Sequence, residues 1–174
     1  MAKHFSAALP IAYVVLRILV VLNWLGGAAI LALLAWSLTN DQWMLTALKI
    51  PDTPAGWKLI WGMRAVAALG LVAILLNYAI LKRLLAVVVT VRVGDPFVAA
   101  NAYRLHAIAW ALLALQLLGL AIAAIAKAVS TPANPFDVDA GFSINGWLAV
   151  ILTFVLARVF AQGTVMREDL EGTV

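Results

Sequence analysis

The chain has 174 residues, of which 66% are hydrophobic and 11% are charged, and its formal net charge is +4. A soluble domain averages about 45–50% apolar and about 25% charged residues. The polar surface is therefore too small to cover a globule in water, and the composition predicts an all-α integral membrane protein. The chain has no cysteine, which excludes a disulfide framework and a thiolate metal site.

Four stretches of the chain contain the roughly 20 apolar residues that a membrane helix needs. They cover residues 18–38, 60–81, 105–127 and 146–166. The first stretch has no small-residue cleavage pattern after a short apolar core, so we interpret it as a retained span and not as a signal peptide. No internal repeat or linker interrupts the chain. The sequence thus predicts a single four-span domain, residues 1–174, folded as a four-helix bundle.

The positions of Lys and Arg predict how the spans are oriented. Lys3 and Arg17 lie before and at the start of the first span, and Arg167 follows the last one. The connection between the second and third spans holds Lys82, Arg83, Arg92 and Arg104. Positively charged connections usually remain in the cytoplasm. We therefore expect a multi-pass protein of the cytoplasmic membrane, with both termini and the 82–104 connection inside.

The two external connections differ in character. Residues 39–59 contain Trp43, Met44 and Leu45, and we expect a short amphipathic piece there that lies along the membrane surface. Residues 130–145 are rich in Pro, Asn, Asp and Gly and predict a loop.

The stretch Gly94-Asp95-Pro96 predicts a sharp turn between two helices. Glycine suits the left-handed conformation that often follows a helix end. Aspartate is a favourable N-cap, and proline suits the first position of a helix. The second helix is therefore expected to run to about Val93 and the third to begin at Pro96, so that a helical hairpin extends into the cytoplasm.

Polar side chains recur at helical spacing on both sides of this turn. Asn101 and Arg104 share one stripe of the third helix. Arg158, Gln162 and Asp169 share one stripe of the fourth. Arg158 lies 11 residues after Trp147, about 16 Å along the helix. At that depth a charge usually faces the interior and has a partner. The candidate partners are Asp95, Glu168 and Asp169, with the neutral acceptors Gln162, Asn77 and Asn23.

The sequence contains no catalytic constellation. His4 and His106 lie far apart without acidic neighbours, so we expect no metal site, and no cofactor is indicated. The GDPF segment lacks the Gly-Lys-Ser/Thr ending of a phosphate-binding loop. We expect no enzymatic activity and no direct binding of nucleic acid.

Two motifs are similar to those of a family of small four-helix bacterial membrane proteins, known as domain of unknown function 2975. The first is VRVGDPFVAANAYRL, with Gly94, Pro96, Phe97, Asn101 and the Arg104-Leu105 pair. The second is the arginine-bearing last helix with its acidic tail, Arg167-Glu168-Asp169. The resemblance implies a protein of the bacterial inner membrane. Members are often encoded beside a small helix-turn-helix regulator, which implies such a regulator as a cytoplasmic partner.

These observations leave three hypotheses. The first is a regulatory membrane protein whose cytoplasmic face holds Arg92 and Arg104 beside the acidic tail and binds a soluble partner. The second is a subunit of an oligomeric transporter or channel, with Asn23, Asn77, Gln116 and Arg158 along a polar path. The third is a structural membrane subunit in which polar residues only fix helix packing. The candidate polar network or partner face comprises Asp95, Asn101, Arg104, Arg158, Gln162, Glu168 and Asp169.

Overall fold

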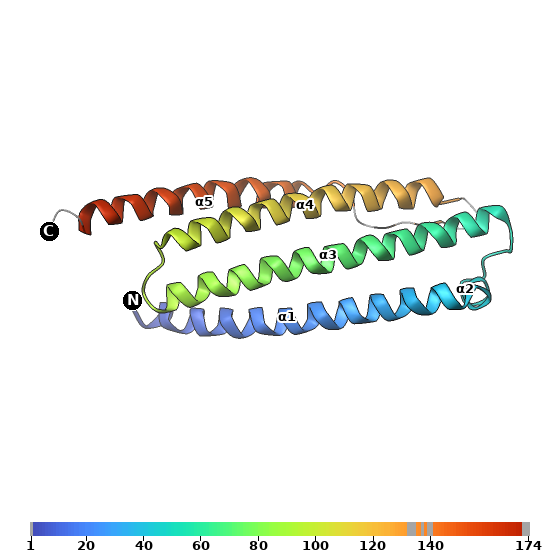
Figure 1. The fold of residues 1–174 in the computed structure, drawn as a ribbon, viewed down its shortest axis with the longest axis horizontal. Helices are drawn as coiled ribbons and strands as arrows, with labels where there is room; N and C mark the ends of the chain where they lie inside the picture. The colour runs from blue at the N-terminus through green and yellow to red at the C-terminus, as the bar shows by residue number, and fades with distance from the viewer. Residues whose placement is uncertain (1, 132–134, 137, 139–140, 172–174) are drawn as a thin grey trace. The chain divides into compact units, whose positions relative to one another are not determined.

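Helices account for most of the chain in a computed structural model, which describes residues 2–131, 135–136, 138 and 141–171. No strand occurs in these residues, in agreement with the all-helical prediction. Asp137, Asp139 and the end of the acidic tail, residues 172–174, lie outside the described part. The helices are α1 (Ala2–Thr39), α2 (Asp41–Ala47), α3 (Pro54–Arg92), α4 (Ala99–Val129) and α5 (Ile144–Glu171) (Figure 1).

Each of the four predicted spans lies within one long helix. The helices α1, α3, α4 and α5 are each long and apolar enough to cross a membrane, which agrees with the prediction of four spans and indicates a multi-pass membrane protein. The helices extend beyond the spans and contain 38, 39, 31 and 28 residues. The longest of them reaches nearly 60 Å at 1.5 Å per residue, about twice the thickness of a hydrocarbon core.

The connection after α1 contains the short helix α2, where the sequence predicts an amphipathic piece. Met44 is buried, whereas Trp43 on the same helix is 48% exposed. The Trp43 ring meets the Trp36 ring edge-on, with 6.5 Å between the ring centroids. The α2 helix therefore has an inner and an outer side, as an amphipathic segment requires.

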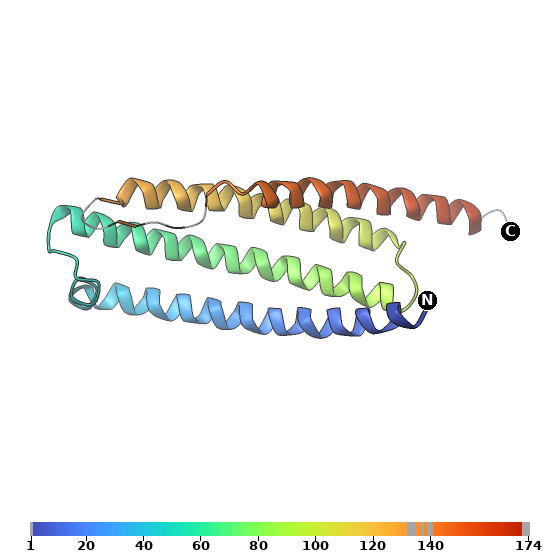
Figure 2. The same cartoon turned by 180° about the vertical axis from the view of Figure 1, so that it is seen from behind.

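The turn between α3 and α4 differs in part from the prediction. Gly94 has a φ of +89° and ends α3, as expected. The amide of Asp95 donates to the Thr90 carbonyl and that of Gly94 to the Val91 carbonyl, which together form a Schellman cap. The prediction that α4 begins at Pro96 with Asp95 as its N-cap is wrong, because residues 95–98 are non-helical and α4 begins at Ala99 (Figure 2).

The chain divides into two compact units. Unit 1 comprises residues 1–23, 76–114 and 144–174. It contains the first part of α1, the end of α3, the first half of α4 and all of α5. Unit 2 comprises residues 24–75 and 115–143, and it contains α2 and the remaining parts of α1, α3 and α4.

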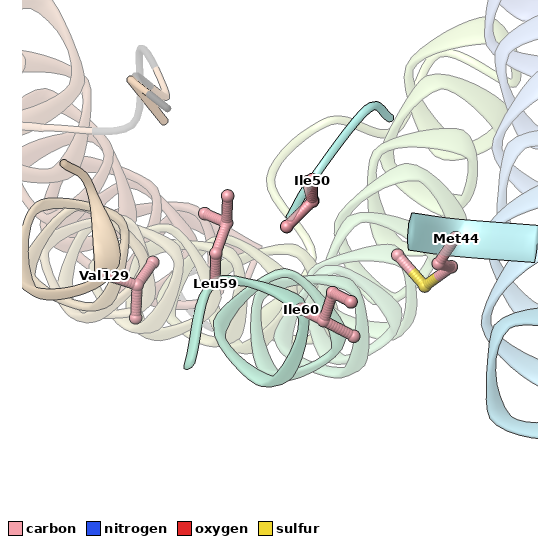
Figure 3. Packing of buried hydrophobic residues seen from close by; sticks show 5 residues of the cluster. All are labelled: Met44, Ile50, Leu59, Ile60 and Val129. Carbon is pink, nitrogen blue, oxygen red and sulfur yellow. The ribbon is translucent and has the colours of Figure 1, made fainter. Parts of the chain in front are cut away.

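Unit 2 has a small apolar core where α2, the start of α3 and the end of α4 meet. Ile60 is fully buried at its centre. The cluster comprises Met44, Ile50, Leu59, Ile60 and Val129 (Figure 3). A close helix contact supports it, because a Cβ atom added to Gly62 would lie 2.6 Å from Val129 Cγ1. Glycine at 62 therefore lets α3 and α4 approach each other here.

Candidate functional site

The turn between α3 and α4 is organised around one buried amide. Asn101, in the first turn of α4, has no exposed surface. Its Nδ2 atom donates to Thr90 Oγ1 at 2.6 Å and to the Pro96 carbonyl at 2.9 Å. The Thr90 hydroxyl in turn donates to the Val87 carbonyl at 2.7 Å. One side chain of α4 thus binds the last turns of α3 and the connecting segment at the same time.

Arg104 completes this arrangement from the next turn of α4. Its Nη1 atom donates to Asn101 Oδ1 at 2.7 Å and lies 3.5 Å from the Ala86 carbonyl. Both donors of the Asn101 amide and its oxygen are consequently used within the unit. We call Thr90, Pro96, Asn101 and Arg104 the Asn101 hub. A buried polar group with satisfied hydrogen bonds fixes one geometry, because any displacement leaves a donor or an acceptor unpaired.

Phe97 attaches the connecting segment to α5. A Cβ atom added to Gly163 would lie 2.7 Å from Phe97 Cδ1, so the ring packs against the bare backbone of α5. The Phe160 ring lies beside it, with 5.3 Å between the centroids. Phe97 therefore forms a contact between the turn and a third helix, α5.

An ion pair makes a second connection to α5. The Asp95 carboxylate accepts a hydrogen bond from Arg167, and both side chains are about half exposed. We expected basic residues of the turn to face the acidic tail. This ion pair has the opposite polarity, because the acid comes from the turn and the base from α5. Arg92 instead lies over the ring of Tyr13, at 5.2 Å from its centroid.

The polar stripe of α5 faces outward from unit 1. Its members, Arg158, Gln162, Val165 and Asp169, are all exposed, as is Glu168 beside them. Two open grooves of about 490 and 500 Å³ adjoin the stripe, and Arg158 lines both. The expectation that Arg158 faces the interior with a polar partner is wrong. Its side chain is exposed, and no described residue forms a hydrogen bond or an ion pair with it.

The register of α4 and α5 explains this placement. The two helices run antiparallel in unit 1, with His106 5.5 Å from Phe154 between ring centroids. Arg158 lies one turn further along α5 and shares a groove with Ala102 in the first turn of α4. Counting residues from Trp147 placed Arg158 in the middle of a span. Its neighbours place it close to the turn between α3 and α4.

The residues of the suggested polar path have other roles where the structure shows them. Gln116 Nε2 donates to the Ser143 carbonyl at 3.2 Å, one residue before α5 begins. Arg158, as described above, faces outward. The hydrogen bond of Gln116 holds the residue just before α5. Neither this contact nor the outward direction of Arg158 supports a polar path shared by these residues.

A second polar cluster, in unit 2, was not predicted. Arg64 of α3 is only 6% exposed. Its Nε atom donates to Ser37 Oγ at 2.9 Å, and Nη2 donates to the Ser37 carbonyl and, at 2.5 Å, to Asp41. Ser37 Oγ in turn lies 2.8 Å from the sulfur of Met44. The sequence offers one signal of this cluster, a cation, Arg64, within the apolar window of the second span.

The fold and the polar clusters define a multi-pass helical membrane protein with a tightly hydrogen-bonded turn at one end of its helices. The chain matches the family described as Protein of unknown function (DUF2975) over residues 7–174, nearly its whole length. It therefore belongs to that family, as its two motifs indicated. No curated protein and no solved structure matches the chain significantly.

Proposed function

We propose that this chain is a regulatory protein of a bacterial inner membrane that binds a soluble partner at the end formed by the α3–α4 turn and α5. Both termini and the turn would face the cytoplasm. The partner class implied by the family resemblance is a small helix-turn-helix regulator. The proposed activity is binding and not catalysis.

The distribution of charge supports this orientation. Unit 1 contains eight of the twelve Lys and Arg residues and four of the eight acids, so it has the whole net charge of +4. Unit 2 contains four residues of each sign and is formally neutral. An excess of positive charge near span ends favours the cytoplasmic side.

The main support for the proposal is a surface of exposed apolar and charged side chains beside a turn whose geometry is fixed. Val93 at the tip is 80% exposed, and Val165 and Met166 on α5 are 57% and 67% exposed. Arg158 of the α5 stripe lines the same groove as Val165 and Met166. Protein interfaces combine an apolar centre with a polar rim. Because the Asn101 hub and Phe97 already hold the turn in place, little conformational entropy would be lost on binding.

The proposal is tested by photo-crosslinking in living cells with a photoreactive amino acid at position 93 or 166. Position 101 is unsuitable because Asn101 is fully buried. We expect both positions to capture a soluble DNA-binding protein, identified by mass spectrometry. The matched control is position 33 in unit 2, where Leu33 is similarly exposed at 62%.

A second variant separates the partner face from the fold. The double substitution Arg158→Gln with Glu168→Gln changes two exposed side chains that no described residue binds. It should reduce capture from position 93 while leaving thermal unfolding unchanged. Capture of only lipid or of a second copy of the chain from positions 93 and 166 would contradict the proposal.

A further inference from the structure

A groove between α1 and α3, distant in sequence from the α5 stripe, gathers positive charge that the proposed partner face does not use. It has a volume of about 340 Å³ and lies wholly within unit 1. Two aromatic and two basic side chains line it: Tyr13, Arg17, Tyr78 and Lys82. We call it the Tyr13 groove.

Two cations, Arg17 and Lys82, line this groove, and a third, Arg92, lies over the ring of Tyr13. The guanidinium carbon of Arg17 lies 5.1 Å from the centroid of the Tyr13 ring. That of Arg92 lies 5.2 Å from the same centroid, so the two carbons are at most about 10 Å apart. Lys82 lines the same groove from α3. All three side chains are exposed.

None of these cations has an acidic partner among the residues that the structure describes. Arg167, by comparison, is paired with Asp95. An anion that binds between exposed cations relieves their mutual repulsion. Guanidinium and ammonium groups together bind phosphate oxygens well, the first through paired N–H donors and the second as a compact charge. The chemistry of these three cations therefore suits a phosphate group.

The surroundings of the groove indicate where that phosphate comes from. Val14, Ile18 and Val21, on the same stretch of α1 as Arg17, are 55%, 53% and 58% exposed. Val89, which lines the groove from α3, is 43% exposed. Such a surface suits hydrocarbon and not water. A ligand that satisfies both the cations and the aliphatic surface has an anionic head and an apolar tail.

We propose that the Tyr13 groove binds an anionic phospholipid of the membrane, with the headgroup phosphate held by Arg17, Lys82 and Arg92. A second copy of the chain is a poor occupant, because a symmetric contact through this groove would bring the same three cations of both copies together. The proposal does not depend on the soluble partner, since α1 and α3 line the groove, whereas the exposed side chains of the partner face lie on the α3–α4 turn and on α5.

The test is native mass spectrometry of the full chain in detergent, with equal amounts of phosphatidylglycerol and phosphatidylcholine. We expect preferential retention of phosphatidylglycerol. The variant Arg17→Gln with Lys82→Gln should weaken that retention by about twenty-five-fold, because each cation near an anionic headgroup contributes a factor of about five. Both substituted side chains are exposed, so the fold should persist and can be checked by thermal unfolding.

The matched control is Arg83→Gln with Arg158→Gln, which removes the same charge from unit 1 outside the groove. Arg83 donates to the Ala79 carbonyl, and Arg158 lies on the α5 stripe. This control should retain phosphatidylglycerol as well as the unchanged protein does. Equal losses of phosphatidylglycerol retention in both double variants would overturn the assignment of the site, since net charge alone would then explain binding.

Two further results would overturn the assignment of a lipid. One is equally strong binding of glycerol phosphate, which has the head but no acyl chains. The other is a groove variant that changes the oligomeric state and not the retained lipid. The variant Tyr13→Leu provides an independent check, because it removes the ring under both guanidinium groups without changing the charge, and it should also weaken retention.

Discussion

The two units are built from the same kind of aliphatic helix, yet they are held together differently. Unit 1 depends on a neutral amide, Asn101, that forms hydrogen bonds with three other residues and is fully buried. Unit 2 depends on a buried cation, Arg64, beside a small apolar cluster. The whole net charge resides in unit 1. The comparison indicates that unit 1 combines a fixed turn with the net charge of the chain, whereas unit 2 combines a buried cation with formal neutrality.

The largest effect is expected from Asn101→Leu in unit 1. The substitution leaves the Pro96 carbonyl and an Arg104 N–H group without their partner, and each buried unpaired group costs about 1–3 kcal/mol. We expect a loss of about 2–3 kcal/mol in the free energy of unfolding, measured by denaturant titration in detergent. Tyr103→Ala, at an 80% exposed position two residues away, is the control and should be nearly neutral. Equal free energies of unfolding for the two variants would contradict the claim that unit 1 depends on the buried Asn101 amide.

Arg64→Leu in unit 2 should cost less, about 1–2 kcal/mol. It removes three hydrogen bonds, but it also removes a charge whose burial is itself unfavourable. Asp41→Asn should cost less still, because the Asp41 side chain is 50% exposed. The same titration measures all three variants. A loss for Arg64→Leu greater than that for Asn101→Leu would reverse the proposed comparison.

A smaller effect tests helix packing in unit 2 at two adjacent glycines. A Cβ atom added to Gly27 would lie 2.8 Å from Ile74 Cγ2, whereas one added to Gly26 has nothing within 4 Å. Gly27→Ala should therefore destabilise by about 1 kcal/mol through overpacking. Gly26→Ala should instead stabilise by up to about 1 kcal/mol through helix propensity. If both substitutions changed the stability in the same direction in thermal unfolding, the close contact between α1 and α3 would be refuted.

The smallest effect is expected for the ion pair between the turn and α5. Asp95 and Arg167 are 41% and 44% exposed, and exposed pairs contribute about 0.2–1 kcal/mol. A double-mutant cycle with Asp95→Asn and Arg167→Gln should give a coupling energy in that range. The coupling should decrease at high salt. A coupling that salt leaves unchanged would indicate that Phe97, and not the ion pair, orients the two side chains.

The sequence predicted the number and type of the long helices because the apolar runs are long and few folds can satisfy backbone groups in lipid. It also predicted the left-handed Gly94. It misplaced the start of α4, because Asp95 and Pro96 satisfy local rules for a helix start but the anchoring of Phe97 on Gly163 depends on α5.

The directions of Arg64 and Arg158 could not be predicted for a related reason. A helix that is apolar on every side gives no indication of which face is inside. Arg158 was therefore expected to face inward but is exposed, whereas Arg64 is buried. Their directions follow from the register between helices, which no single helix encodes.

The central claim, that the charged end with the α3–α4 turn faces the cytoplasm, is tested most directly by cysteine labelling. The chain has no cysteine, so the single variants Val93→Cys and Gln42→Cys each provide one reactive site, and both positions are exposed. With a membrane-impermeant maleimide on intact spheroplasts, whose outer membrane has been removed, we expect labelling at position 42 and labelling at position 93 only after lysis. Labelling of position 93 in intact spheroplasts would contradict the account.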